Sequence, residues 1–443
     1  MSEINQRFLI DQFLLKHYGF EQFTPGLERS YPLYAQLKNE FEARGVKVVT
    51  IAGTNGKGQT SYELSRLLKA TGIVHTVWSS PHIFSITERF LSSEGLIELN
   101  TLWDLINECH RSLEIEHPNK KFSFYEFLFL VFLKWSAQFD ALKVLVLEVG
   151  LGGRFDAVNH LDCDLAAITS ISRDHQAILG PRYDLILYEK LGVARPHKKL
   201  FTHFKLDYLN QKTMEYTKEQ RIKWQPLTIH LAKHLNQNIS LEAPVDYFKA
   251  NLVLARTLFD EMAFLLNLHL PTLMEKIDQS RPEIFKAREE CWSYFKRVEL
   301  HFIGAHNPDG MRETARRLQQ NGLQFEGVIC AFSKRDLADV TCMLKTLNYY
   351  KREKHLMTAL YPTVFEHLKA LDSKNLEDVL ANFGHNIDQT IYDWKNILQT
   401  IMGQGRSLQD VGSENKKRWL FLGSYYFIGD VQHHLERFFP RDL

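Results

Sequence analysis

Residues 46–70 read VKVVTIAGTNGKGQTSYELSRLLKA. Apolar and β-branched residues fill positions 46–52, a glycine-rich loop covers 53–58, and a helical pattern runs from Thr60 to Ala70. A strand, such a loop and a helix, in that order, direct backbone N–H groups and a helix N-terminus at a phosphate group. The glycines permit a tight turn, and Lys57 supplies a positive charge for the β- and γ-phosphates of a nucleotide. The stretch predicts a phosphate-binding loop more strongly than a glycine-rich surface turn.

The loop lacks one component that its type usually has. A hydroxyl residue commonly follows the lysine and helps to hold a metal ion, but Gly58 stands in that place. We expect another part of the chain to supply that ligand. The residues predicted to bind the cofactor are those of the loop and the first helical turn: Gly53, Thr54, Asn55, Gly56, Lys57, Gly58, Gln59 and Thr60.

The overall composition indicates a folded protein of more than one domain. The chain has 443 residues, of which 44% are apolar and 12% aromatic, so it contains ample material for two cores. Its 54 basic and 53 acidic residues give a net charge of +1, which offers no electrostatic basis for binding nucleic acid or an anionic membrane. The N-terminus lacks the pattern of a signal peptide, and the most apolar run, 127–133, is too short to span a bilayer.

The five cysteines are scattered and have no CxxC spacing. An odd number without a regular pattern argues against a disulfide framework and against a zinc knuckle. Ordinary thiols in a reducing cytoplasm are the simplest interpretation, so we expect a cytoplasmic protein.

Short β-rich runs alternate with helical patterns along the first two thirds of the chain. Such alternation is typical of parallel strands joined by helical crossovers, and the near-continuous apolar run 142–149 indicates a strand covered on both faces. The predicted fold class is therefore α/β, with a doubly wound, mostly parallel sheet. The predicted strands are 46–52, 75–79, 142–149, 165–171 and 199–203; a long helical stretch is expected over 101–139, and 204–245 receives no assignment.

The alternation restarts after about residue 290. Its strand candidates are 298–303, 327–332, 355–360 and 419–422. A second, smaller, Rossmann-like α/β domain is the economical interpretation. We expect the domains to span 1–293 and 294–443.

Polar side chains follow three of the predicted strands. Ser80 follows the second strand, Glu148 ends the third, and His175 follows the fourth. In an open α/β sheet, ligands bind at the carboxyl ends of the strands. Each residue alone has an ordinary alternative, such as a turn glutamate or a hydrogen-bonded structural histidine, but three at one edge beside a phosphate loop favour metal binding.

The ordered motifs resemble a known family, bacterial folylpolyglutamate synthase/dihydrofolate synthase of the Mur-ligase superfamily. Besides GTNGKG at 53–58, the similar segments are PGLER at 25–29, SSPH at 79–82, FYEF at 124–127, EVGLGGRFDAVN at 148–159, TSISRDH at 169–175, YEKLGVARP at 188–196, GAHNP at 304–308 and GSYY at 423–426. They cover nearly the whole chain. The resemblance implies a Mur-ligase-like ATP-binding domain and a C-terminal glutamate-ligase-type domain.

The resemblance also implies a reaction: an ATP-dependent amide ligase adds L-glutamate to dihydropteroate or a folate through an acyl phosphate. Lys57, Lys190 and His175 match catalytic positions, and Ser80, Glu148, His175 and Lys190 match metal-binding positions. The expected cofactors are ATP and Mg²⁺, with a second ion at Lys190 if that lysine is carbamylated. From the residues alone, an ordinary helix-surface lysine is the favoured interpretation of Lys190.

Further positions are implied in the same way. Asn251 and His306 match nucleotide-contacting residues. The predicted substrate contacts are Phe124, Tyr125, Glu126, Phe155 and Asp156, since aromatic rings stack on a flat heterocycle and an acid pairs with its N–H donors. Packing within a helix core is the alternative for the aromatic residues. We expect small-molecule partners only (a pteroate or folate, L-glutamate and ATP), no nucleic acid, no membrane, and a monomer.

The chain departs from the family at three positions, the first of which is Gln59, where the phosphate loop of the family has a hydroxyl residue. Ile284 stands where the family has an arginine that contacts ATP, and Ile303 stands where it has an aspartate before GAHNP. Each of the two isoleucines removes a charge-assisted hydrogen bond worth about 1.5–3 kcal/mol. Two alternatives therefore stay open: an amide ligase of the same superfamily acting on another carboxylic acid, and a degenerate paralogue that binds nucleotide or pterin with little turnover.

Overall fold

The computed structural model describes residues 3–20, 26–227, 247–279, 289–383, 389–407 and 416–439. The chain divides into two compact units, Met1–Glu283 and Ile284–Leu443. The predicted boundary between 293 and 294 falls inside a strand of the second unit, Glu289–Tyr294, which pairs with the next strand, Val298–Gly304.

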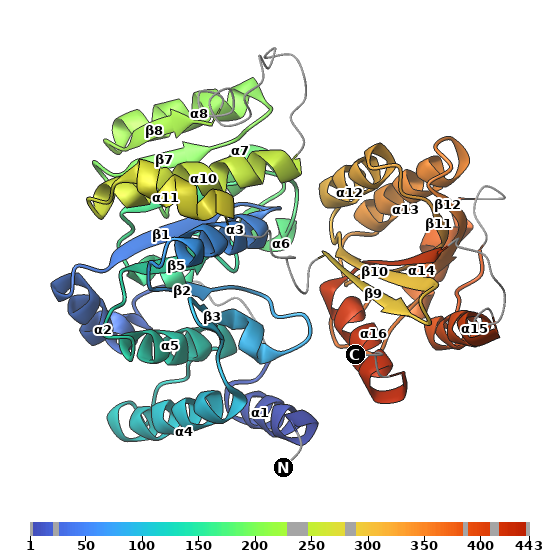
Figure 1. Cartoon of the computed structure of the whole chain (residues 1–443), viewed down its shortest axis with the longest axis horizontal. Coiled ribbons are helices and arrows are strands. Elements are labelled where there is room, and N and C mark those ends of the chain that lie inside the picture. The colour runs from blue at the N-terminus through green and yellow to red at the C-terminus, as the bar shows by residue number, and fades with distance from the viewer. Residues whose placement is uncertain are drawn as a thin grey trace. The chain divides into compact units, whose positions relative to one another are not determined.

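The first unit contains a single eight-stranded sheet (Figure 1). Its strand order is β4-β3-β2-β5-β1-β6-β7-β8, and the six strands from β2 to β8 in that order are parallel. The strands are β1 (Lys47–Ala52), β2 (His75–Trp78), β3 (Phe90–Ser92), β4 (Gly95–Leu96), β5 (Val144–Glu148), β6 (Leu165–Ile168), β7 (Lys199–Thr202) and β8 (Lys223–Pro226).

Helices cover both faces of this sheet (Figure 1). Successive strand residues therefore point alternately into the core on one face and the core on the other. Val49 and Ile51 of β1 pack with α3, α10 and α11, whereas Val48 and Ala52 pack in the core that contains α2, α5 and α7. The helices are α1 (Glu3–Tyr18), α2 (Tyr31–Ala43), α3 (Lys57–Ala70), α4 (Leu99–Glu116), α5 (Phe124–Ala137), α6 (Gln176–Leu179), α7 (Tyr183–Leu191), α8 (Asp207–Glu219), α10 (Tyr247–Leu265) and α11 (Leu270–Gln279), with 3₁₀ turns η1 (Ile86–Arg89) and η2 (Ala157–His160).

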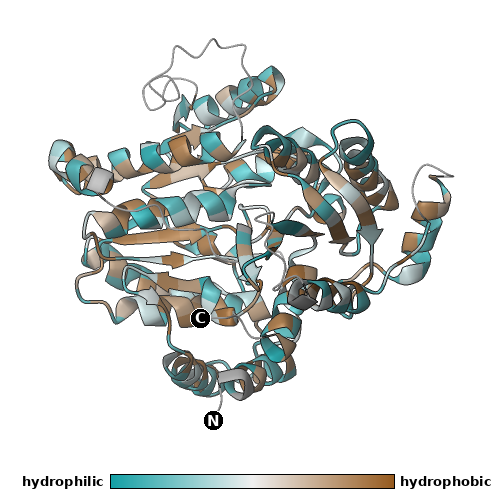
Figure 2. Ribbon diagram, turned by 45° about the vertical axis from the view of Figure 1, so that its right-hand side comes forward, coloured by the Kyte–Doolittle hydropathy of each residue, from teal (hydrophilic) through white to brown (hydrophobic). Residues whose placement is uncertain are grey.

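The second unit repeats the α/β principle on a smaller scale. Its five-stranded sheet has the order β12-β11-β13-β10-β9, and only the β9–β10 pair among these described strands is antiparallel. The elements are β9 (Glu289–Tyr294), β10 (Val298–Gly304), α12 (Pro308–Gln320), β11 (Phe325–Ala331), α13 (Leu337–Arg352), β12 (Met357–Pro362), α14 (Ser373–Ala381), α15 (Trp394–Ser407), β13 (Lys417–Gly423) and α16 (Tyr425–Phe438). Figure 2 shows apolar residues concentrated along the strands and polar residues on the outer helices.

The predicted fold class is confirmed, and each predicted strand has a counterpart within a few residues. The single helix expected over 101–139 was wrong. It is two helices, α4 and α5, separated by 117–123, because Pro118 disfavours a helical residue before it and cannot continue the ladder. The unassigned region contains α8 and β8, and the rest of it, 228–246, lies outside the described residues. Among the described helices, none has the length and hydropathy needed to cross a bilayer.

Candidate active site

The phosphate loop connects β1 to α3 and depends on two glycines with positive φ. Gly53 has φ 143° and Gly56, the N-cap of α3, has φ 91°. At both positions a Cβ atom would also collide with a neighbour: 1.9 Å from Thr169 Oγ1 at Gly53, and 2.3 Å from Asn251 Nδ2 at Gly56. The glycines are therefore required both by the turn and by the close approach of other segments.

The segment after β6 fixes the loop from one side. Thr54 N donates to Ser170 O at 2.8 Å and Asn55 N donates to Ser170 Oγ at 2.9 Å. The hydroxyl group of Thr169 donates to Asn55 O at 2.7 Å, and Ser172 N donates to Thr54 Oγ1 at 3.1 Å. Sequence reasoning missed the role of these three residues, although a run of small hydroxyl residues directly after a strand is a recognisable signal. They hold the loop in shape before any ligand binds.

Lys57 lies over the loop. Its Nζ donates to Gly53 O at 3.1 Å and to Thr54 O at 3.3 Å. The ammonium group thus lies among the loop residues at the N-terminus of α3. A phosphate group bound there would accept a further hydrogen bond from it. The predicted role of Lys57 in binding phosphate stays a prediction.

Gln59 and Asn251 contact each other. Asn251 Nδ2 donates to Gln59 Oε1 at 2.8 Å, and Gln59 Nε2 donates to Phe248 O at 3.3 Å. Both were predicted to bind the nucleotide, and in this structure they link the first turn of α3 to α10. The hydroxyl group of Thr60 donates to Gly56 O at 3.0 Å, within the helix itself.

Ser80 and Glu148 lie together at the carboxyl edge of the sheet. Glu148 ends β5, which pairs with both β1 and β2, and its Oε2 accepts from Ser80 N at 3.3 Å. Both residues are buried, with exposed fractions of 0% for Glu148 and 4% for Ser80. Hydroxyl and carboxylate oxygens are ligands that Mg²⁺ accepts, so the pair fits the predicted metal site chemically.

His175 lies in the segment after β6, exposed to solvent. It adopts a left-handed conformation with φ 49° as the N-cap of α6. Its backbone N–H donates to Asp174 Oδ1 at 3.0 Å. Asp174 is buried. The same segment contains Ser170, which accepts from the phosphate loop.

Lys190 is buried on α7 and joins the loop directly. Its Nζ donates to Gly53 O at 2.9 Å. Burial, together with the positive charge of Lys57, lowers the pKa of Lys190 from its ordinary 10.5 to about 7. An ordinary surface lysine has neither property, so the structure separates Lys190 from that alternative.

The glycine-rich segment after β5 packs against α7 next to Lys190. A Cβ atom on Gly153, whose φ is 156°, would lie 2.9 Å from Glu189 O and 3.3 Å from Lys190 Cα. Arg154 N donates to Glu189 O at 2.8 Å, and the two side chains form an ion pair at 2.7 Å. This segment positions the helix that bears Lys190, a role not predicted from the sequence.

Three of the predicted substrate residues have their polar groups engaged within the protein. Glu126 accepts from Ser123 in a capping box and pairs with Arg29 at 2.6 Å. The Tyr125 hydroxyl donates to Asp156 Oδ1 at 3.1 Å, and Asp156 Oδ2 also accepts from the backbone N–H groups of Gly150 and Leu151 at 2.9 Å. Burial raises the pKa of Asp156 to about 6, against the opposing effect of these hydrogen bonds.

The two phenylalanines predicted for the substrate are half-buried and lie beside arginines. The Arg154 guanidinium lies 4.3 Å from the centre of the Phe155 ring, and that of Arg89 lies 5.6 Å from the Phe124 ring. Such cation–π contacts hold rings in place. Phe124 and Phe155 keep partial exposure, as does Tyr125, whereas Glu126 and Asp156 are buried.

In the second unit, His306 follows β10, and its ring lies 5.0 Å from that of Tyr425. The next residue, Asn307, caps α12 by accepting from Gly310 N at 2.8 Å. Ile303 is 4% exposed and packs in the core of this unit. Ile284 lies outside the described residues.

The first unit is a doubly wound sheet with a glycine-rich loop between β1 and α3, and a second, smaller α/β unit follows it. The solved structures with this fold include Mycobacterium tuberculosis folylpolyglutamate synthase complexed with ADP, which matches at 20% identity with a TM-score of 0.76 over 98% of this chain and 99% of that one. They also include bifunctional folylpolyglutamate synthase/dihydrofolate synthase from Yersinia pestis with AMPPNP and a Mn ion, at 23% identity and a TM-score of 0.72 over 98% and 100%.

Curated relatives point to the same proteins. Dihydrofolate synthase/folylpolyglutamate synthase of Escherichia coli is 41% identical over 155 residues, which is 34% of this chain and 35% of the relative. The namesake of Bacillus subtilis is 24% identical over 438 residues, 93% and 95% of the two chains. The matched region thus spans about a third of the length of the Escherichia coli relative, and no family model matches. The resemblance predicted from the motifs is confirmed by these homologues and structural neighbours.

Proposed function

We propose that the protein is an ATP-dependent amide ligase that adds L-glutamate to dihydropteroate, to a reduced folate, or to both. One observation supports this most directly: the phosphate loop with Lys57 and the buried Ser80–Glu148 pair occupy the carboxyl edge of one parallel sheet. This edge is where α/β sheets bind ligands, and it offers both a triphosphate cradle and oxygen ligands.

The proposed reaction has two balanced steps. A carboxylate oxygen of the pteroate or folate attacks the γ-phosphorus of ATP, the bond from that phosphorus to the β,γ-bridging oxygen breaks, and ADP leaves. The α-amine of glutamate, in its neutral form, then attacks the acyl carbon; a C–N bond forms, inorganic phosphate leaves, and the amine loses a proton.

The protein residues act by holding charge and position rather than by covalent chemistry. Lys57 and the N–H groups at the start of α3 bind the β- and γ-phosphoryl oxygens as negative charge shifts toward ADP. A magnesium ion held by Ser80, Glu148 and His175 would neutralise part of the triphosphate charge. The expected cost of losing one such preorganised partner is about 10²–10³ in turnover.

Lys190 is proposed to be carbamylated. A lysine reacts with CO₂ only as the neutral amine: a C–N bond forms and one proton is released. Burial beside Lys57 makes the neutral form abundant near pH 7. The resulting carbamate is an anion with oxygen donors, suited to a second magnesium ion.

The remaining site assignments are proposals of the same kind. Phe124 and Phe155, which keep part of their surface exposed, are proposed to lie against the pterin ring. Asn251 and Gln59 are proposed to act on the nucleotide through the loop that they support, while His306 stays a prediction. We further propose that the protein acts in the cytoplasm as a monomer on small molecules only.

One observation favours a second candidate, a ligase for a different carboxylic acid. The acids predicted to pair with the pterin, Glu126 and Asp156, are already hydrogen-bonded within the protein, and Tyr125, predicted to stack on it, donates its hydroxyl group to Asp156. A panel of carboxylic acids, with products scored by the mass of one added glutamate residue, separates the two candidates.

The direct test is phosphate release by the purified protein with dihydropteroate, glutamate and MgATP. Hydroxylamine in place of glutamate should trap the acyl phosphate as a hydroxamate. Lys57→Ala should lose at least about a hundredfold in turnover, whereas Lys69→Ala, which changes an exposed lysine of the same helix, should keep it. Normal nucleotide binding without phosphate release, on every acid of the panel, would refute an amide ligase.

A further inference from the structure

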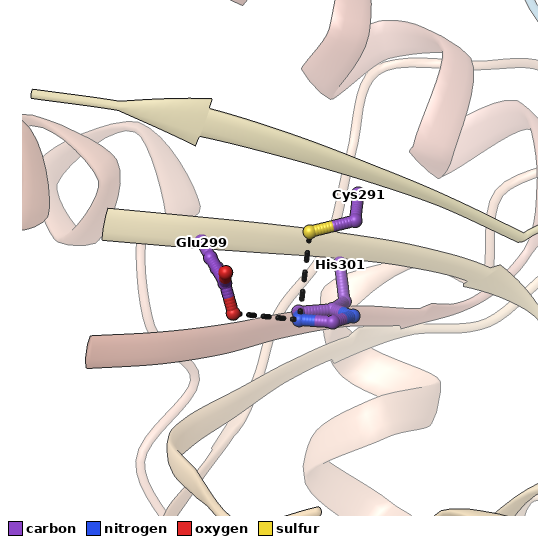
Figure 3. A group of neighbouring side chains, drawn as sticks. All are labelled: Cys291, Glu299 and His301. Carbon is purple, nitrogen blue, oxygen red and sulfur yellow. Dashed lines mark hydrogen bonds and ion pairs between the residues drawn. The ribbon is translucent and has the colours of Figure 1, made fainter. Parts of the chain in front are cut away.

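Three side chains that bind metals well converge on one face of the smaller sheet (Figure 3). Cys291 is on β9, and His301 is directly opposite it on the antiparallel strand β10. Glu299 precedes His301 by two positions, so its side chain lies on the same face of the sheet. Within the described parts of the chain, this is the one group of three His, Cys, Asp or Glu residues with ligand atoms all within 4.8 Å of one another.

The distances match those of one shared ion. Cys291 Sγ lies 3.6 Å from His301 Nε2, and Glu299 Oε2 lies 3.8 Å from the same nitrogen. With zinc bond lengths of about 2.3 Å to sulfur and 2.0–2.1 Å to nitrogen or oxygen, a tetrahedron separates S from N by about 3.6 Å and N from O by about 3.4 Å. Small rotations of the Glu299 side chain close the remaining gap.

The surroundings hold the carboxylate in place. Lys416 donates to Glu299 Oε1 at 2.7 Å and Arg418 to Oε2 at 2.9 Å. Burial alone would raise the pKa of Glu299, but these two hydrogen bonds outweigh it and lower that pKa. A carboxylate that binds a metal commonly accepts such outer hydrogen bonds, which orient it.

The thiol would have to ionise when an ion binds. Partial burial and the charge of Glu299 raise the pKa of Cys291 to about 11, so the metal-free thiol is protonated at neutral pH. Binding therefore replaces the thiol proton by the metal, and one proton leaves for each ion bound.

We propose that Cys291, Glu299 and His301 bind one zinc ion, with water as the fourth ligand. Thiolate and imidazole favour zinc over magnesium or calcium, which prefer oxygen ligands. The ion would join β9, which is the edge strand of the sheet and the first strand of the second unit, to β10. It would thereby stabilise the pairing of these two strands. This proposal uses none of the residues assigned to the ligase reaction, so it does not depend on the proposed function.

The test is a Co²⁺ titration of the full chain in excess Mg²⁺, followed by displacement with Zn²⁺. A thiolate-to-cobalt charge-transfer band in the near ultraviolet reports only a site that contains cysteine, so ions bound at Ser80, Glu148 or His175 do not contribute. We expect one equivalent of Co²⁺ to produce the band, and Zn²⁺ to remove it. Zn²⁺ should also raise the melting temperature of the wild type.

Cys342→Ser is the matched control, since Cys342 is a half-buried thiol of the same unit that lies near Arg312. Cys291→Ser should abolish the band, His301→Gln and Glu299→Gln should weaken binding at least about tenfold, and Cys342→Ser should change nothing. The proposal is overturned if the wild type gives no band, or if the band survives Cys291→Ser. Circular dichroism of each variant confirms that a loss of binding is not a loss of folding.

Discussion

Lys190 is the residue whose chemistry the structure changes most. The motif alone left open an ordinary helix-surface lysine, whereas the folded chain buries its amine 2.9 Å from Gly53 O and lowers its pKa to about 7. A buried ammonium group beside Lys57 is unfavourable, because desolvation and like charge both favour the neutral amine. Conversion to an anion would remove this repulsion.

We expect carbamylation of Lys190 to rise with pH. With a pKa of about 7, roughly a tenth of the amine is neutral at pH 6 and roughly nine tenths at pH 8, against under one per cent for an ordinary lysine at pH 8. At a fixed concentration of dissolved CO₂, ¹³C-labelled carbamate measured by NMR should therefore increase between these pH values.

Lys190→Arg provides the negative control, because arginine stays charged and cannot react. Lys198→Arg serves as the matched control, because Lys198 is exposed to solvent and forms an ion pair with Asp164. This substitution should leave the carbamate signal intact. Absence of the signal in the wild type at pH 8 would contradict carbamylation.

The positions of the site residues were predictable, but several of their roles were not. Lys57, Ser80 and Glu148 follow strands of one parallel sheet, so the sequence alone places them at one edge. Tyr125 and Asp156 were assigned to the substrate by resemblance, and their use as internal hydrogen-bonding groups follows from burial and from backbone N–H groups that no motif reveals.

At the level of elements, the phosphate loop depends on α10. Gly56 sits where any side chain would meet Asn251, which is hydrogen-bonded to Gln59. A methyl group at this position would displace the Asn251 amide and break that hydrogen bond. The contact between α3 and α10 therefore excludes a side chain at Gly56.

We expect Gly56→Ala to destabilise the first unit more than Gly72→Ala does. Both positions have positive φ, 91° and 75°, which costs about 1–2 kcal/mol for alanine, but open space surrounds Gly72. The lost hydrogen bond adds about 1 kcal/mol at Gly56. Urea unfolding measures the difference, and binding of an ATP analogue should weaken only in Gly56→Ala. Equal effects of the two substitutions would contradict the role of Asn251.

The sequence also predicted most of the elements. Long apolar strands such as β1 and β5 have a clear pattern, because both of their faces are buried. The strands that were missed, β3, β4, β8 and β9, are either very short or lie toward a sheet edge, where burial imposes little pattern. Their pairing is decided by neighbours that are distant in the sequence.

At the level of the whole molecule, the two units have separate cores. Changes deep in one unit should therefore leave the other unaffected. Ile303 is suited to test this, because an aspartate there would bury a carboxylate within the core of the second unit.

We expect Ile303→Asp to cost about 3–5 kcal/mol and to raise hydrogen exchange only in peptides after residue 289. Ile303→Val, which only removes a methyl group, should cost about 0.5–1.5 kcal/mol. Gly56→Ala should raise exchange only in peptides before residue 280. A large gain in turnover by Ile303→Asp would instead indicate a degenerate site, and a change of exchange in both units would contradict their independence.

The hydrogen bond between Gln59 and Asn251 joins residues 192 positions apart. During translation the loop leaves the ribosome long before its supporting helix exists. The residues that support the loop are synthesised in order: the hydroxyl residues after β6 first, and Asn251 much later. A nascent chain that ends before α10 thus lacks Asn251, the last of these supports. The proposed nucleotide binding should therefore require synthesis of nearly the entire first unit.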